Sequence, residues 1–205
     1  MLLYKTVAGR AQAEQEIEKS RFIAYIAPVS SKEEGDAFIA EIRAKHKDAT
    51  HNVPAMVVGD KMQIQWASDD GEPQGTSGAP MVQLLTGMEL TNVCIVVTRY
   101  FGGTKLGTGG LVRAYSSSAR LAVEAAGIRE VKEMTVADIS IEYTHLAKLQ
   151  NVARERGWLI EDEVYEDKGK MKLICASEEA DTMMKMLAEI TAGSCVVAGC
   201  SEEAR

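Results

Sequence analysis

The chain has 205 residues, of which 46% are hydrophobic and 26% are charged, proportions typical of folded globular proteins. This composition excludes an intrinsically disordered or fibrous chain. The apolar runs are far shorter than the roughly 20 residues that span a bilayer, and no basic segment followed by an apolar one opens the sequence. We therefore expect a cytoplasmic protein with no membrane partner.

Charge is unevenly distributed along the chain. Residues 1–130 contain 14 Lys and Arg against 15 Asp and Glu, whereas residues 131–205 contain 9 against 15, so most of the net charge of −7 lies in the last third. This asymmetry predicts two domains, 1–130 and 131–205, and argues against a globally basic nucleic-acid binder. A local basic patch remains compatible with it.

The first 130 residues predict a mixture of strands and helices. The expected elements are a strand at 21–29, a helix at 30–46 capped by Ser30 or Ser31, hairpin strands at 53–58 and 62–67, a short helix at 80–86, a buried strand at 93–98 and a helix at 111–126. Gly127 is expected to end the last helix.

The last third has a different pattern. Strands are expected at 134–142, 158–165, 170–176 and 194–200, and helices at 146–156 and 179–191. The order β-α-β-β-α-β is that of the ferredoxin-like fold. It places a domain boundary near residues 127–133.

Two glycine-rich segments, one within 68–80 and one within 99–110, each end at a predicted helix N-terminus, where unpaired N–H groups attract anions. Arginine and lysine flank the second segment. We expect an anion-binding surface formed by Gly75, Thr76, Gly78, Arg99, Gly102, Gly103, Lys105, Gly107, Gly109, Gly110 and Arg113. The alternative is that these glycines only form turns. Neither segment has the spacing of a nucleotide-binding motif, so no cofactor is expected.

Three carboxylates, Asp69, Asp70 and Glu72, lie in the first glycine-rich segment. They have the chemistry to hold Mg²⁺, to cap a turn, or to pair internally with the loop arginines. No histidine or second carboxylate cluster accompanies them, so we expect no bound metal. The four cysteines form no C-x-x-C pair and are interpreted as small buried residues on strands.

Aromatic and histidine residues give weaker indications. His51 is interpreted as a hydrogen-bonded residue at the start of a strand, and no nucleophile motif of a hydrolase is present. Tyr100, Phe101 and Tyr115 lie beside the second glycine-rich segment, where aromatic faces next to arginine can stack nucleic-acid bases. For Phe101, packing in the core is the favoured interpretation and base stacking is the alternative.

The segments SDDGEPQGTSGAP (68–80) and VTRYFGGTKLGTGGLVRAY (97–115) closely resemble the motifs of the YigZ/IMPACT family, and residues 18–22 and 50–52 fit the same pattern. The resemblance implies an α+β protein. Its N-terminal domain would be like the second domain of a ribosomal small-subunit protein and domain IV of elongation factor G, and its C-terminal domain would be ferredoxin-like. The family commonly has Cys and an aromatic residue where this chain has Val53 and Pro54. Thiol chemistry at that place is therefore excluded.

The resemblance also implies a connection with translation. Eukaryotic relatives act in translational control, but with an additional N-terminal domain that this sequence does not contain, so their regulatory role is not carried over. We expect a non-catalytic binding protein that contacts RNA or a ribosome-associated protein through the anion-binding surface. The alternatives are an enzyme for a phosphorylated or nucleotide substrate with a metal on Asp69, Asp70 and Glu72, and a pure protein-interaction module.

Overall fold

The computed structural model describes residues 1–205, which divide into two units. Residues 4–130 form one unit, here the N-terminal unit, and residues 131–205 with 1–3 form the other, here the C-terminal unit. Each unit has buried apolar clusters of its own. The two units are described separately.

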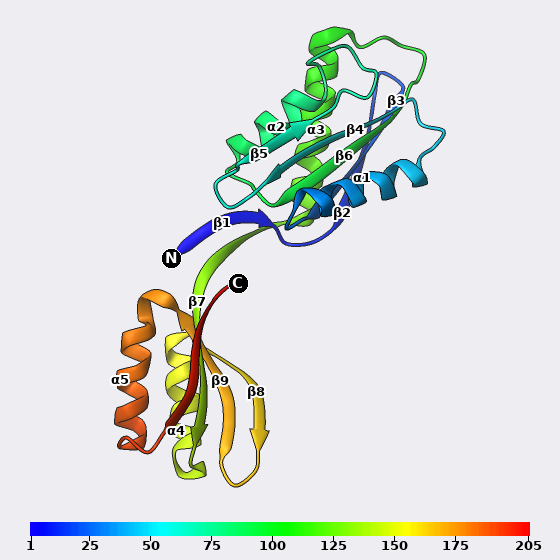
Figure 1. Cartoon of the computed structure of the whole chain (residues 1–205). Helices are drawn as coiled ribbons and strands as arrows, with labels where there is room; N and C mark the ends of the chain where they lie inside the picture. The colour runs from blue at the N-terminus through cyan, green and yellow to red at the C-terminus, as the bar shows by residue number, and fades with distance from the viewer. The chain divides into compact units, whose positions relative to one another are not determined.

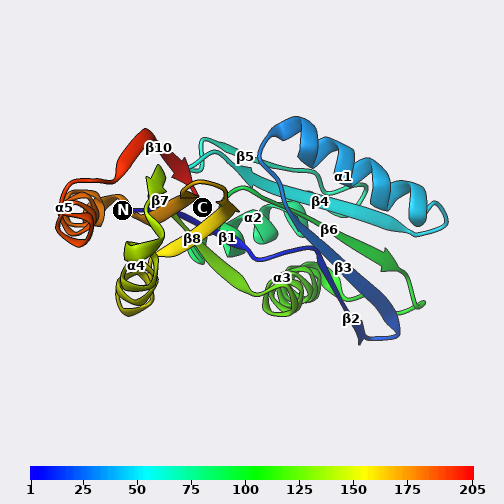
Figure 2. The same ribbon diagram turned by 90° about the horizontal axis from the view of Figure 1, so that it is seen from below.

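The N-terminal unit contains a five-stranded antiparallel sheet (Figure 1). In spatial order its strands are β2 (Ala11–Ile17), β3 (Ser20–Pro28), β6 (Val93–Tyr100), β4 (His51–Val58) and β5 (Ile64–Ala67). The helix α1 (Lys32–Lys45) covers one face, and α2 (Gly78–Gly87) and α3 (Gly107–Ala126) cover the other, as the view in Figure 2 shows for α1 and α3.

The inner strands are buried on both faces because helices cover both faces. In β3, Phe22 and Ile26 pack in the cluster below α2 and α3, whereas Ile23 and Tyr25 pack against α1. The strand β6 alternates in the same way, which explains why residues 93–98 are apolar without interruption. The predicted buried strand is therefore confirmed.

The strand register determines which residues meet at one end of this sheet. In the β4–β6 pair His51 lies opposite Arg99, and in the β3–β6 pair Phe22 lies opposite Arg99. Both glycine-rich segments begin within a few residues of this end: the first continues from β5 and the second from β6. The sheet thus brings the two segments together.

Two features of the N-terminal unit differ from the sequence prediction. The helix α3 begins at Gly107 rather than at 111, so Gly107, Gly109 and Gly110 lie in its first turn and not in a loop. The edge strand β2 was not predicted, because its outward positions carry Gln12, Glu14 and Glu16, residue types that are depleted in strands.

The C-terminal unit contains β7 (Ile128–Ile141), α4 (Tyr143–Arg156), β8 (Leu159–Tyr165), β9 (Gly169–Ala176), the 3₁₀ turn η1 (Ser177–Glu179), α5 (Ala180–Thr191) and β10 (Val196–Ala204). The strand order β10-β7-β9-β8, antiparallel throughout, is that of a ferredoxin-like sheet, and β1 (Leu2–Val7) also pairs with β7. The α+β class and the β-α-β-β-α-β order are confirmed.

The segment 127–133 is not an irregular linker. Gly127 ends α3 with φ of 70°, a conformation that suits glycine, and β7 starts at the next residue. All four cysteines are free thiols: Cys94 and Cys175 are buried on strands, as expected. Cys195 is half-buried between α5 and β10, and Cys200 is exposed, so for these two the interpretation as buried strand residues is wrong. No helix is long and apolar enough to span a membrane.

Candidate functional site

The first glycine-rich loop, residues 68–78, folds around the carboxylate of Asp69. This carboxylate accepts hydrogen bonds from the N–H groups of Gly75 (2.7 Å), Ser77 (3.2 Å) and Gly78 (2.9 Å) and from the Ser77 hydroxyl (2.6 Å). Burial alone would raise the pKa of Asp69, but these hydrogen bonds together lower it below its usual value. An ionised Asp69 thus occupies the N-terminus of α2.

The remaining residues of this loop are also engaged within the protein. The Thr76 hydroxyl donates to the carbonyl of Pro73 at 2.6 Å. A Cβ at Gly78 would lie 2.8 Å from the carbonyl oxygen of Ser68, so no larger residue fits there. Gly75, Thr76 and Gly78, which the sequence placed on the anion-binding surface, therefore belong to a turn that binds its own aspartate.

Asp70 connects the loop to β4 and α1. Its carboxylate accepts from the N–H of Asn52 at 2.7 Å and pairs with Arg43 at 3.0 Å, and its carbonyl oxygen lies 2.8 Å from His51 Nδ1. The three carboxylates of the loop thus serve three separate sets of contacts. No group of three or more His, Cys, Asp or Glu side chains in the chain is placed to hold a metal ion.

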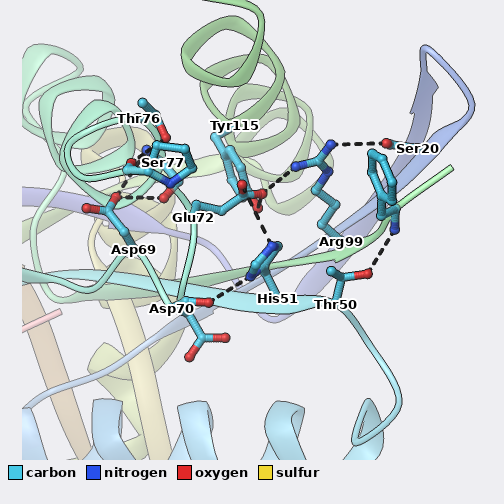
Figure 3. A network of polar contacts seen from close by, with 12 residues as sticks. Ser20, Thr50, His51, Asp69, Asp70, Glu72, Thr76, Ser77, Arg99 and Tyr115 are labelled. Atoms are coloured by element: carbon cyan, nitrogen blue, oxygen red, sulfur yellow. Dashed lines mark hydrogen bonds and ion pairs between the residues drawn. The ribbon is translucent and has the colours of Figure 1, made fainter. Parts of the chain in front are cut away.

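Glu72 is the centre of a buried polar network that joins the two loops (Figure 3). Its Oε1 accepts from Arg99 Nη1 at 2.6 Å and from the Tyr115 hydroxyl at 2.8 Å. A second nitrogen of Arg99 donates to Ser20 Oγ at 3.2 Å. Burial, and then the neighbouring Glu72 carboxylate, raise the pKa of Tyr115, so its hydroxyl remains protonated and donates.

The position of Arg99 decides between two of the sequence hypotheses. Arg99 is 5% exposed and its charge is paired with Glu72, so it is not a free cation waiting for an anion. Its Nε has no hydrogen-bond partner. Arg99, near the end of β6, therefore forms an internal pair with the first loop, as in the alternative given in the sequence analysis.

His51 lies between Asp70 and Glu72 at the start of β4. Because a carbonyl oxygen only accepts, the contact with Asp70 places a hydrogen on Nδ1. The other nitrogen, Nε2, is 3.8 Å from Glu72 Oε2, which is beyond hydrogen-bond distance. The imidazole side chain is 18% exposed.

The second glycine-rich loop, residues 101–106 together with the first turn of α3, is fixed at its start. The N–H of Phe101 donates to Thr50 Oγ1 at 2.9 Å, and the N–H of Gly102 donates to Ser20 Oγ at 3.3 Å. A Cβ at Gly102 would lie 1.8 Å from the carbonyl oxygen of Lys19, so the chains approach too closely for any other residue. Gly103 follows in an exposed, left-handed conformation with φ of 88°.

The end of this loop is an uncapped helix N-terminus. No side chain caps α3, and its first turn, which includes Gly107, Gly109 and Gly110, contains no acidic residue. Lys105 before it and Arg113 within it are exposed and form no ion pair. This part of the molecule has the electrostatic character that attracts an anion.

A pocket of about 470 Å³ lies between the two loops. His51, Glu72 and Arg99 form its polar wall. Phe101 and Lys105 line it on the side of the second loop. Its other lining residues are Thr50, Pro73, Leu106, Gly107, Thr108 and Leu111.

The sequence analysis did not assign several of these residues to a site. Ser20 and Thr50 were noted only within family motifs, and His51 was interpreted as structural. Tyr115 was expected to offer a ring for base stacking, but it is fully buried and its hydroxyl donates to Glu72. Phe101, for which core packing was favoured, is instead 47% exposed. A polar residue at the end of a strand gives no indication of its partner when that partner lies on a strand far away in the sequence. The motif segments at 18–22 and 50–52 were the available signal, since both contribute residues to this end of the sheet.

The fold and the site together define a two-unit α+β protein with a pocket between two glycine-rich loops, at one end of the sheet of its N-terminal unit. Residues 18–123 match the Impact N-terminal domain family, and residues 139–194 match a family described as a domain of unknown function (DUF1949). The chain belongs to the IMPACT family.

Two curated relatives and one solved structure illustrate the similarity. The chain is 40% identical to the IMPACT family member YvyE of Bacillus subtilis over 190 residues, which is 93% of this chain and 88% of that protein. It is 40% identical to YigZ of Escherichia coli over 138 residues, or 66% and 68% of the two chains. A crystal structure described only as that of a hypothetical protein aligns with a TM-score of 0.62 at 32% identity, covering 96% of this chain and 97% of the other.

Proposed function

We propose that this protein is a cytoplasmic, non-catalytic binding protein of the translation apparatus that contacts single-stranded RNA through its second glycine-rich loop. The connection with translation comes from the family, whose eukaryotic relatives act in translational control. The contact with RNA comes from the chemistry of the loop.

The observation that carries the proposal is the uncapped N-terminus of α3 with two unpaired cations beside it. A 20-residue helix presents N–H groups and the positive end of its dipole at Gly107–Gly110. Lys105 and Arg113 add two positive charges that no carboxylate neutralises. Phosphate groups of a nucleic acid are the anions that such an arrangement favours.

Phe101 favours RNA over an isolated inorganic anion. Its ring is 47% exposed and lies 5.5 Å from the Arg99 guanidinium carbon, at the same pocket as Lys105. An exposed aromatic ring beside a phosphate site is the usual platform on which an unpaired base stacks. Residues 131–205, with 9 basic against 15 acidic residues, offer no comparable surface.

The test is the binding of a labelled single-stranded RNA by the double variant Lys105→Ala/Arg113→Ala. Each charge-assisted contact contributes about 1.5–3 kcal/mol, so the affinity should fall at least tenfold, since about 1.4 kcal/mol is one decade. The slope of log affinity against log salt should also decrease by about 0.7 per lost phosphate contact. Fluorescence anisotropy at several salt concentrations measures both.

The matched control is the double variant Lys61→Ala/Arg120→Ala. Both residues are exposed and without ion pairs, and Lys61 lies in the β4–β5 turn at the opposite end of β4 from His51. This control removes the same charge and should retain the affinity. An equal loss in the two double variants, or no RNA binding by the unmodified protein, would reject the proposal.

We also infer that the two units are separate domains that meet within residues 127–133. Three observations support this: the division between Glu130 and Val131, the separate apolar clusters, and the concentration of negative charge after residue 130. Hydrogen exchange in a variant that is destabilised only within residues 4–130 tests this inference.

A further inference from the structure

The pocket between the loops has the size and the lining of a site for a small planar group. Its volume of about 470 Å³ lies within the range of roughly 300–1,000 Å³ typical of ligand sites. Pro73, Leu106 and Leu111 give it apolar walls, and the half-exposed ring of Phe101 adds an aromatic face. One end of the pocket is polar, so a ligand that fits it must have both an apolar part and a polar part.

The polar end contains one unpaired donor, Arg99 Nε, and two acceptors that no donor reaches, one on Glu72 and one on His51. Glu72 Oε1 already accepts from Arg99 and Tyr115, but no hydrogen bond reaches Glu72 Oε2. The Glu72 side chain is only 4% exposed and lines the pocket, so a ligand in the pocket can reach this unpaired oxygen. Leaving such an oxygen without a donor is unfavourable.

His51 adds a second acceptor. Its Nδ1 donates to the Asp70 carbonyl, so in the neutral ring Nε2 carries a lone pair. This nitrogen and Glu72 Oε2 are 3.8 Å apart, and the structure places no donor between them. A ligand that satisfies both must therefore bring neighbouring N–H groups.

Among the four RNA bases, guanine alone has two adjacent donors on its Watson–Crick edge, at N1 and N2. Adenine and cytosine place an amino group beside an acceptor nitrogen, and uracil has one N–H between two carbonyl groups. Proteins read unpaired bases by stacking on aromatic rings and by hydrogen bonds to this edge.

We propose that the pocket binds a guanine base, with N1–H and N2–H₂ donating to Glu72 Oε2 and His51 Nε2, and the ring against Phe101. The inference rests on the proposed function, because the RNA phosphate would lie at the N-terminus of α3. Gly107 and Thr108 of that helix line the same pocket, so phosphate and base sites are contiguous. The base recognised is the same in an RNA strand and in a free guanine nucleotide.

The experiment compares three labelled eight-nucleotide RNAs that are identical except for one central base: guanine, inosine or adenine. Inosine lacks only the N2 amino group. Loss of one hydrogen bond to a charged acceptor should weaken binding by roughly tenfold or more, so the expected order is guanine, then inosine, then adenine. GMP alone is titrated in a parallel measurement to separate the free nucleotide from the strand.

Variants assign the preference to the pocket. His51→Asn retains an N–H near the position of Nδ1 for the Asp70 carbonyl but removes the acceptor at Nε2, and Phe101→Leu removes the aromatic face. Each should reduce the preference for guanine, whereas the control variants His145→Asn and Trp66→Leu, which lie outside the pocket, should retain it. Melting curves of all four variants verify that they are folded.

The outcomes separate this inference from the proposed function. Equal affinity for the three RNAs, with salt dependence that still requires Lys105 and Arg113, would overturn the guanine site and leave RNA binding intact. GMP bound as tightly as the guanine RNA, with the same loss in His51→Asn, would support the guanine site and reject the RNA strand as its natural source. Unchanged preference in both pocket variants would overturn the inference.

Discussion

The two glycine-rich loops share a high glycine content and have opposite electrostatic character. Both are rich in glycine and both lead into a helix, yet the N-terminus of α2 is occupied by Asp69 while that of α3 has no acidic residue and no capping side chain. The difference lies in one carboxylate placed six to nine residues before the amide groups it binds. Glycine content thus indicates a helix N-terminus that an anion can approach, and the upstream acidic residue decides whether the protein supplies that anion itself.

The largest expected effect is on the pair that ties the loops together. Replacing Arg99 with Ala leaves Glu72 buried without its cation, which should lower the free energy of unfolding by about 3–5 kcal/mol. Thermal unfolding measures the change, and the exposed Arg113→Ala serves as the control with little effect on the melting temperature.

The same variant tests the domain boundary. If the units are separate domains, hydrogen exchange in Arg99→Ala should accelerate for the strands and helices of residues 4–130 and not for those of residues 131–205. An unchanged melting temperature would contradict the role of the Arg99–Glu72 pair. Uniform acceleration across the chain would contradict the separate domains.

An intermediate effect is expected when the first loop loses its own anion. Asp69→Asn should cost about 1–3 kcal/mol, because hydrogen bonds from three N–H groups and one hydroxyl lose a charged acceptor. The folded-state pKa of Asp69 is below its unfolded value. Its stabilisation is therefore complete above the unfolded pKa of about 4 and disappears as the pH falls through the lower folded-state pKa.

Urea unfolding of the unmodified protein and Asp69→Asn between pH 7 and pH 2 measures this contribution. The difference in stability between the two proteins should be constant at neutral pH and should shrink in acid. A difference that grew as the pH fell would contradict the assignment of Asp69 as an ionised cap.

The smallest effect on stability should come from making the second loop resemble the first. Thr108 is exposed in the first turn of α3, and Thr108→Asp places a negative charge at the helix N-terminus, which should stabilise the fold by about 0.3–1 kcal/mol. The same charge should repel phosphate and lower RNA affinity. Gln12→Glu, at an exposed position on β2, changes the net charge equally and should leave the affinity unchanged. Loss of affinity in both variants would point to net charge and not to the loop.

Much of the fold followed from apolar patterning, and the interior of the site did not. The uninterrupted apolar residues of β6 and the alternating pattern of β9 predicted strands correctly, because burial determines both patterns. The charged contacts depend on register instead. Nothing local to Arg99 indicates that Glu72 is its partner, since the pair forms only when β6 and the first loop are placed by the sheet. Asp69 and Asp70 are adjacent in sequence but have unrelated contacts. Composition does not indicate which contacts each of the two carboxylates makes.

The pairing of β3 with β6 has a kinetic consequence. Ser20 and Arg99 are 79 positions apart, and their contact requires that the central strands of the sheet have already joined. Pairings between distant segments are slow to form, because the chain entropy of closing a long loop is lost before the contacts are gained. Local hairpins such as β4–β5 can form early, but they contain only part of the pocket. A chain still folding, or one partly unfolded, therefore has no complete pocket, and occupancy of the pocket would report that the central sheet is complete.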